Sequence, residues 1–395
     1  MEFIPSNWLY NAGVIGFLRV LESAGENKVN VENFLKEDGG VEIDDFDKKF
    51  LKEVKKVDNY EIPKLAYYYL IFNFNEIVNG EASSDDEKIK KVWGKLFNTY
   101  YRGFFNANTN YLFQHSKRSP ALIQQFSDFV RNMTNSNKNS SIKCSFCLKS
   151  DYNFFYKNKF TSEHNKILGA SIGEVPNTFW NLDKKNSLSI CDFCSYILLH
   201  YHLGIIKLSN NSEIFINAPS FKIMWHLNNH ARTLYEKQRA KEVKEILGMS
   251  LIEMTSRLQL QLSKWTKMNI EVIVKYKVKV NEKWEDKIDF FSLPYEVVDV
   301  LSDREVASLL NKIGEFKILN MVLDGKFNEI LKFGERVFRI AIKPRNEWGK
   351  QERDFINENI KLERNNSNLI SFSQNIFKLY ALINDKIKKE VLIWT

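Results

Sequence analysis

Two short segments, Cys144-Ser-Phe-Cys147 and Cys191-Asp-Phe-Cys194, decide how this chain is organised. They contain the only four cysteines among its 395 residues. Two Cys-x-x-Cys turns can present four thiolates to one tetrahedral Zn²⁺, so Cys144, Cys147, Cys191 and Cys194 are the predicted metal ligands. Because protein would then fill all four positions, we expect a structural zinc site, without the open position that a catalytic zinc keeps.

Two other uses of paired cysteines have to be weighed. Two disulfides are the first, but the chain starts without the basic and apolar segments of a secretion signal, so we expect a reducing, cytoplasmic location. A zinc deaminase is the second, but its His-x-Glu and Pro-Cys-x-x-Cys signature is absent, since Lys143 and Ile190 precede the two pairs. His164 between the pairs is expected to be a solvated loop residue. We therefore do not predict an enzyme.

Composition places the chain among folded proteins without membrane spans. Its hydrophobic content is 44% and its aromatic content 14%, which is enough to form a core over most of the length. No stretch approaches the roughly 18 apolar residues that a membrane helix needs. The net charge of +8 is compatible with a polyanionic partner, but a charge of this size spread over 395 residues also serves solubility.

The hydrophobic pattern predicts an α+β fold. Residues 7–22 form an apolar run typical of a buried helix, and Glu271–Val280 alternates as a strand does, with lysines 275, 277 and 279 on one side. Helical patterns dominate after a capping box predicted at Ser302-x-x-Glu305. We expect a mixed N-terminal body, an inserted zinc-ribbon-like module and a C-terminal helical bundle. The expected segments are 1–131 (body), 132–205 (zinc module), 206–300 (continuation of the body, with a strand at 270–280) and 301–395 (helical region).

Residues 91–118 have a composition suited to nucleic acid. Aromatic side chains alternate there with amides and basic residues, and rings can stack on bases while arginine and lysine hold phosphates. The alternative is a helix with an aromatic core face and a polar outer face. The candidate contacts are Arg102, Asn106, Asn108, Asn110, Lys117 and Arg118. His226 and His230, one helical turn apart, suggest a second metal site only weakly, because no His-Glu-x-x-His pattern surrounds them.

Four motifs in order resemble one known family. They are Asn7-Trp-Leu-Tyr-Asn-Ala-Gly13 with its continuation Gly16-Phe-Leu-Arg-Val-Leu-Glu22, the first cysteine pair, Asn177-Thr-Phe-Trp180, and the second cysteine pair. Together they are similar to the large subunit of the type I, subtype B CRISPR Cascade complex. The resemblance spans residues 1 to about 205, and only the four cysteines match positions with a defined role.

The resemblance implies a non-enzymatic subunit of an RNA-guided surveillance complex in antiviral defence. Such subunits contact the 5′ handle of the CRISPR guide RNA, recognise the protospacer-adjacent motif (PAM) in double-stranded DNA and recruit the CRISPR helicase-nuclease. The implied partners also include the other Cascade subunits, among them the backbone and the 5′-handle-capping subunits. Two alternatives stay open: a zinc-stabilised nucleic-acid-binding protein outside CRISPR, which would bind alone, and a metal-dependent enzyme.

Overall fold

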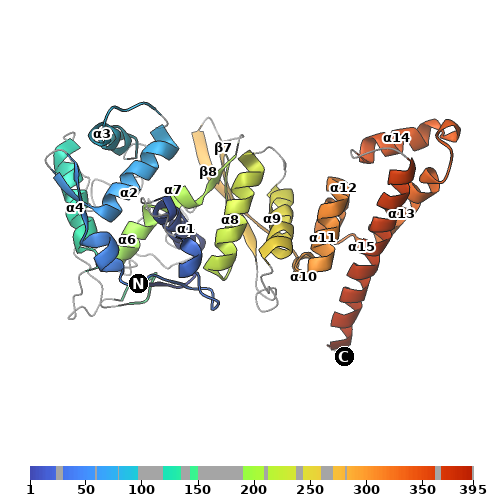
Figure 1. The fold of residues 1–395 in the computed structure, drawn as a ribbon, viewed down its shortest axis with the longest axis horizontal. Helices are drawn as coiled ribbons and strands as arrows, with labels where there is room; N and C mark the ends of the chain where they lie inside the picture. Colours follow the sequence, from blue (N-terminus) through green and yellow to red (C-terminus); the bar gives the residue numbers. More distant parts are fainter. Residues whose placement is uncertain are drawn as a thin grey trace. The chain divides into compact units, whose positions relative to one another are not determined.

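The computed structural model describes residues 1–23, 30–57, 60–78, 80–96, 119–134, 143–149, 190–208, 212–236, 243–258, 270–280, 283–360 and 366–393. The chain divides into two compact units, Met1–Trp225 with Ile273–Phe290 and His226–Val272 with Phe291–Thr395. The fold is α+β, as expected, with small sheets and a C-terminal helical region (Figure 1). It also contains a cluster of four cysteines. The division into four segments predicted from the sequence stays a prediction. Within the described ranges, no helix has both the length and the apolar character to cross a membrane.

The first unit contains most of the short elements. They are β1 (Glu2–Phe3), α1 (Trp8–Ser23), η1 (Val31–Phe34), β2 (Val41–Glu42), η2 (Asp47–Leu51), β3 (Val54–Val57), β4 (Tyr60–Pro63), α2 (Lys64–Asn73), η3 (Phe74–Val78), α3 (Asp85–Leu96), α4 (Ser119–Asn132), α6 (Asp192–Leu198), α7 (Tyr201–Gly204), β5 (Ile206–Lys207) and β6 (Glu213–Asn217). Three further elements cross the division between the units: α8 (Phe221–Glu236), β7 (Glu271–Val280) and β8 (Lys283–Ser292).

Helix α1 is the centre of the first unit. Every residue from Trp8 to Leu21 is buried, which explains why the sequence is apolar on all sides of this helix. Asn7 starts the helix, because its Oδ1 accepts a hydrogen bond of 3.0 Å from the Tyr10 N–H. The buried Asn11 donates to Asn217 Oδ1 over 2.8 Å, so it fixes α1 to strand β6. The opening motif of the chain therefore has a structural role.

The described strands form a four-stranded sheet in the order β5-β6-β7-β8 and two antiparallel pairs, β1-β2 and β3-β4. Strand β7 occupies the segment in which alternation predicts a strand. Of the three lysines on one side of β7, Lys275 lies 3.4 Å from Glu213 Oε2, whereas Lys277 and Lys279 are exposed.

The second unit is helical in its described part. Its elements are α9 (Val243–Leu258), α10 (Tyr295–Leu301), α11 (Arg304–Ile313), α12 (Phe316–Leu323), α13 (Phe327–Ala341), η6 (Arg345–Glu347), α14 (Lys350–Asn359) and α15 (Asn366–Ile393). The long helix α15 packs along α13 and also contacts α11 (Figure 1). Gly334 allows the close contact between α13 and α15, because a Cβ at this position would lie 2.9 Å from the Ile376 side chain.

The capping box predicted at Ser302 is wrong by one residue. Asp303 caps α11, and its Oδ1 accepts hydrogen bonds from the Glu305 and Val306 N–H groups over 2.9 and 3.1 Å. Ser302 instead ends α10 and donates its hydroxyl to Val298 O over 2.6 Å. Serine and aspartate are equally good N-caps, so the sequence pattern alone did not separate them.

Candidate metal centre

The first cysteine pair lies on a tight turn that brings both sulfurs to one side. Leu148 N–H donates to Cys144 O over 3.0 Å, and Cys144 N–H donates to Lys149 O over 2.9 Å. To close the turn, Leu148 adopts φ of 60°, the left-handed region that non-glycine residues rarely occupy. Its side chain is exposed, so the strain comes from the turn rather than from core packing.

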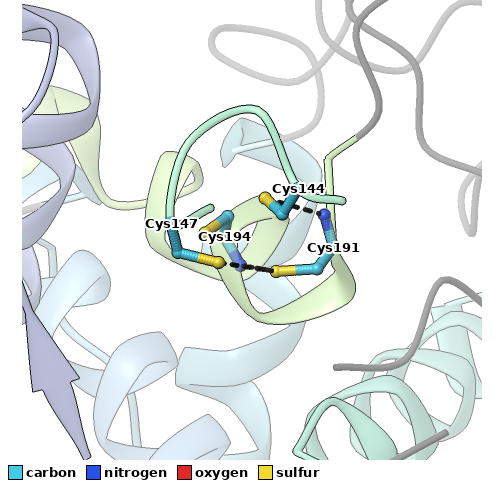
Figure 2. Close-up of side chains that lie close together, drawn as sticks. All are labelled: Cys144, Cys147, Cys191 and Cys194. Carbon is cyan, nitrogen blue, oxygen red and sulfur yellow. Dashed lines mark hydrogen bonds between the residues drawn. The ribbon is translucent and has the colours of Figure 1, made fainter. Parts of the chain in front are cut away.

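The second cysteine pair is placed by the start of helix α6. Cys191 is the N-cap, and its sulfur accepts a hydrogen bond of 3.4 Å from the Cys194 N–H. The Cys191 N–H in turn donates to Cys144 Sγ over 3.4 Å, which joins the two pairs (Figure 2). Backbone donors that point at sulfur favour the thiolate form, which is the form that binds metal.

The four sulfur atoms converge, and each lies within 4.8 Å of the others (Figure 2). The Cys147 and Cys191 sulfurs are 3.8 Å apart. In a tetrahedral site with Zn–S bonds of about 2.3 Å, two sulfurs lie about 3.8 Å apart. Three of the cysteines are buried and Cys147 is half-buried. Among the described residues this is the one group of three or more such side chains placed to hold a metal ion, and all four of its donors are protein thiols.

The ionisation of the four thiols indicates that the cluster favours binding of a cation. Hydrogen bonds from Cys147 and then from the other two thiols lower the pKa of Cys144, whereas burial raises the pKa of Cys194. Four adjacent thiols cannot all ionise without a positive charge among them. Burial, and then the negative charge of the cysteines, also raises the pKa of Tyr10 well above its usual value. The Tyr10 phenol therefore stays neutral beside the cluster.

A phenylalanine within each cysteine pair anchors the cluster to the core. Phe146 packs on Tyr10 of α1 with ring centroids 5.9 Å apart, and Phe193 packs on Phe3 and Phe46 at 5.5 and 6.2 Å. These contacts make the cysteine cluster continuous with the core of the first unit. No role was predicted for these two phenylalanines from the sequence. The Phe at the same position in both Cys-x-x-Cys pairs is a pattern from which a shared packing role could have been inferred.

Glycines allow α1 to approach the backbone of α6 and α7. A Cβ on Gly16 would lie 2.1 Å from His200 O, and one on Gly13 would lie 2.6 Å from Ile197 O. A Cβ on Gly204 would lie 2.0 Å from Ala12 O, so the close contact needs glycine on both sides. Since Cys194 lies in α6 and Cys191 caps this helix, these glycines set the position of half of the candidate metal centre.

The buried histidines next to the cluster are part of the core. His200 is fully buried among Phe17, Tyr69 and Tyr196, and its Nδ1 donates to Tyr196 O over 2.9 Å. Burial lowers its pKa to about 3, so the ring is neutral. His202 Nε2 lies 2.7 Å from Asn73 Oδ1. Within the described ranges, neither these residues nor His226 and His230 on α8 belong to another group of three or more side chains placed to hold a metal ion.

The predicted nucleic-acid contacts lie outside the described residues. Arg102, Asn106, Asn108, Asn110, Lys117 and Arg118 all fall in residues 97–118, and His164 falls in 150–189. Trp93, at the start of the same aromatic stretch, is buried against Phe126 with ring centroids 5.3 Å apart. For Trp93 the alternative interpretation, a core aromatic residue, is therefore correct.

Comparison with known proteins finds a match over the segment of the cysteine pairs. No curated protein and no solved structure is similar to the chain. A family model described as CRISPR-associated protein (Cas_CXXC_CXXC) matches residues 132–206, the segment that contains both cysteine pairs and runs through α6 and α7. The match and the clustered cysteines agree on the same segment, and they mark the chain as a CRISPR-associated protein.

Proposed function

We propose that this chain is the large subunit of a type I, subtype B CRISPR Cascade complex. The observation that carries the proposal is the CRISPR-associated family match over residues 132–206, in which the four cysteines converge on one site. The motif order of the first half supports the finer assignment, because the opening motif forms the helix that packs against the second cysteine pair.

The metal in this proposal is a structural Zn²⁺ held by Cys144, Cys147, Cys191 and Cys194. Four thiolates favour zinc over the hard cations Mg²⁺ and Ca²⁺, and a closed site binds no substrate. The ion would replace hydrogen bonds between thiols with four metal bonds and so fix the turn at residues 144–149 against α6. Because such binding energy is folding energy, the metal would hold this part of the first unit in one arrangement.

The recognition role follows from the division of labour in RNA-guided complexes. Base pairing with the guide reads most of the target, and protein reads the short PAM in the duplex. In this role the cytoplasmic chain contacts the guide 5′ handle, the target DNA and the neighbouring Cascade subunits, and it recruits the helicase-nuclease without catalysing a reaction itself. Arg102, Asn106, Asn108, Asn110, Lys117 and Arg118 are the proposed nucleic-acid contacts.

A selection experiment tests the role in recognition. The guide-loaded complex is purified from cells with and without this chain and is incubated with target duplexes whose flanking positions are randomised. Retained duplexes should be enriched for one flanking motif only when the chain is present. Equal retention of all flanks in both preparations would contradict PAM recognition by this subunit.

Charge reversal tests the proposed contacts. Replacing Lys117 and Arg118 by glutamate should weaken DNA binding by the complex, and the dependence on salt should become flatter by about one unit of slope for each phosphate that the protein no longer neutralises. Replacing the exposed Lys277 and Lys279 in the same way gives a control with the same change in charge. Equal effects of the two double variants would remove Lys117 and Arg118 from the assignment.

A further inference from the structure

A pocket of about 270 Å³ lies within the second unit, among four helices. Its lining residues come from α8, α9, α11 and α12 and from the turn between the last two. This volume lies just below the range of roughly 300–1,000 Å³ that is usual for sites of drug-sized ligands. The pocket is therefore of a size for one side chain of a partner rather than for a large cofactor.

Apolar side chains form part of the lining of the pocket. Leu234, Ile252, Leu310 and Leu319 line it, and each is buried. Phe316 adds an aromatic ring that is partly accessible. Such a surface gains free energy by covering a hydrocarbon stem.

The polar residues of the lining are His230, Thr233, Asn311, Glu253 and Glu315, and two of them are acidic. Glu253 and Glu315 contribute two carboxylates, and Glu315 is only 6% exposed. His230 is the single basic side chain among the lining residues. All three residues also have interactions within the chain, so an incoming cation would add to these interactions or replace them. Two carboxylates repel phosphate, which argues against nucleic acid as the occupant.

A lining that combines apolar residues with two glutamates fits a side chain with a hydrocarbon stem and a cationic head. Arginine fits better than lysine, because a guanidinium pairs with carboxylates through two parallel hydrogen bonds and also stacks on an aromatic face such as Phe316. We propose that this pocket docks an arginine side chain presented by a partner protein. The proposal goes beyond the proposed function and does not depend on the metal centre or on nucleic-acid binding.

Saturation-transfer NMR on the full-length, metal-loaded chain tests the proposal. The probe is N-acetyl-arginine amide at about 1 mM, a concentration suited to a single-residue contact. N-acetyl-citrulline amide is the control probe, because it has nearly the same shape without the charge. The variants are Glu253→Gln, the double variant Glu253→Gln/Glu315→Gln, and Thr233→Trp, which fills the rim at an exposed position. Glu335→Gln, an exposed carboxylate on α13, is the matched control.

We expect the arginine probe to receive saturation and the citrulline probe to bind about ten-fold more weakly, as the loss of a charge-assisted hydrogen bond implies. Glu253→Gln and Thr233→Trp should each weaken arginine binding, and Glu335→Gln should leave it unchanged. Equal saturation of the two probes, unchanged binding in Glu253→Gln and Thr233→Trp, or no saturation of the arginine probe would each overturn the proposal. If the double variant fails to fold, the two single variants decide.

Discussion

The contact of α1 with α6 and α7 makes Gly16→Ala the sharpest test of how the metal centre is built. The new methyl group would lie 2.1 Å from His200 O and 2.9 Å from Gly204 N, both of which are backbone atoms. Ordinary carbon contacts begin at roughly 3.5 Å, so the helices would have to separate by more than about 1 Å. Neither neighbour is the end of a flexible side chain that could turn away.

The expected loss of stability in Gly16→Ala is the balance of two opposing effects. Overpacking a filled core costs about 1–3 kcal/mol, and a clash with backbone places this variant at the upper end. Alanine restores up to about 1 kcal/mol through its better helix propensity. We therefore expect a net loss of about 2 kcal/mol, which lowers the unfolding temperature by about 4–8 °C for a unit of this size.

Thermal unfolding followed by circular dichroism measures this loss, and a metal-release titration with a chromogenic chelator shows whether the candidate metal centre is affected. Gly80→Ala is the control, because a Cβ there would meet nothing closer than 3.6 Å. Gly16→Ala should unfold earlier than the control and release its metal more readily, since α7 directly follows α6, which contains Cys194 and is capped by Cys191. Equal midpoints and equal metal release for the two variants would refute the argument that close helix packing positions the cysteines.

Three further predictions concern local strain, pH and helix capping. Leu148→Gly should stabilise the chain by up to about 1 kcal/mol, because glycine adopts φ of 60° without strain, whereas Leu148→Ala should not; equal stabilities in urea would show that the turn is unstrained. His200 is neutral in the folded chain, with its pKa lowered to about 3, and it takes up a proton on unfolding. Its contribution to the free energy of unfolding is complete above pH 6.5 and falls toward pH 3. Between pH 5 and 6.5, His200→Gln should therefore reduce the slope of this free energy against pH by up to about 1.4 kcal/mol per pH unit. An unchanged slope would contradict the assignment of a neutral, buried His200. Asp303→Ala should lower the free energy of unfolding by about 1 kcal/mol because it removes the cap of α11, and Ser302→Ala should lower it by less. Urea unfolding measures both changes, and the reverse order would favour the capping box predicted from the sequence.

Patterns within a single segment were predictable from the sequence. The apolar run at residues 7–22 predicted α1, and alternation at 271–280 predicted β7. Each of these signals is complete within one segment, because spacing or periodicity alone determines which side chains share a face. The α+β class followed from the same signals.

The two cysteine pairs were predictable as one site because their spacing is repeated, but other features that depend on two segments meeting were not. In the sequence, Gly16 is an ordinary residue of a helix, and only the structure shows that His200 O lies opposite it. The choice between Ser302 and Asp303 as a cap depends on where α10 ends, because both residue types suit that position. The acidic pocket of the second unit combines residues from helices more than 80 positions apart, so no local pattern marks it.

The most direct test of the central claim is the isolation of the tagged chain from its native cell, with sequencing of the bound RNA and identification of the proteins that copurify. If the chain is a Cascade large subunit, it should retain processed CRISPR guides that share one 5′ handle, together with repeated copies of a backbone subunit. Recovery of the chain alone, or with RNA unrelated to CRISPR guides, would contradict the claim and would leave a metal-stabilised nucleic-acid-binding protein as the better account.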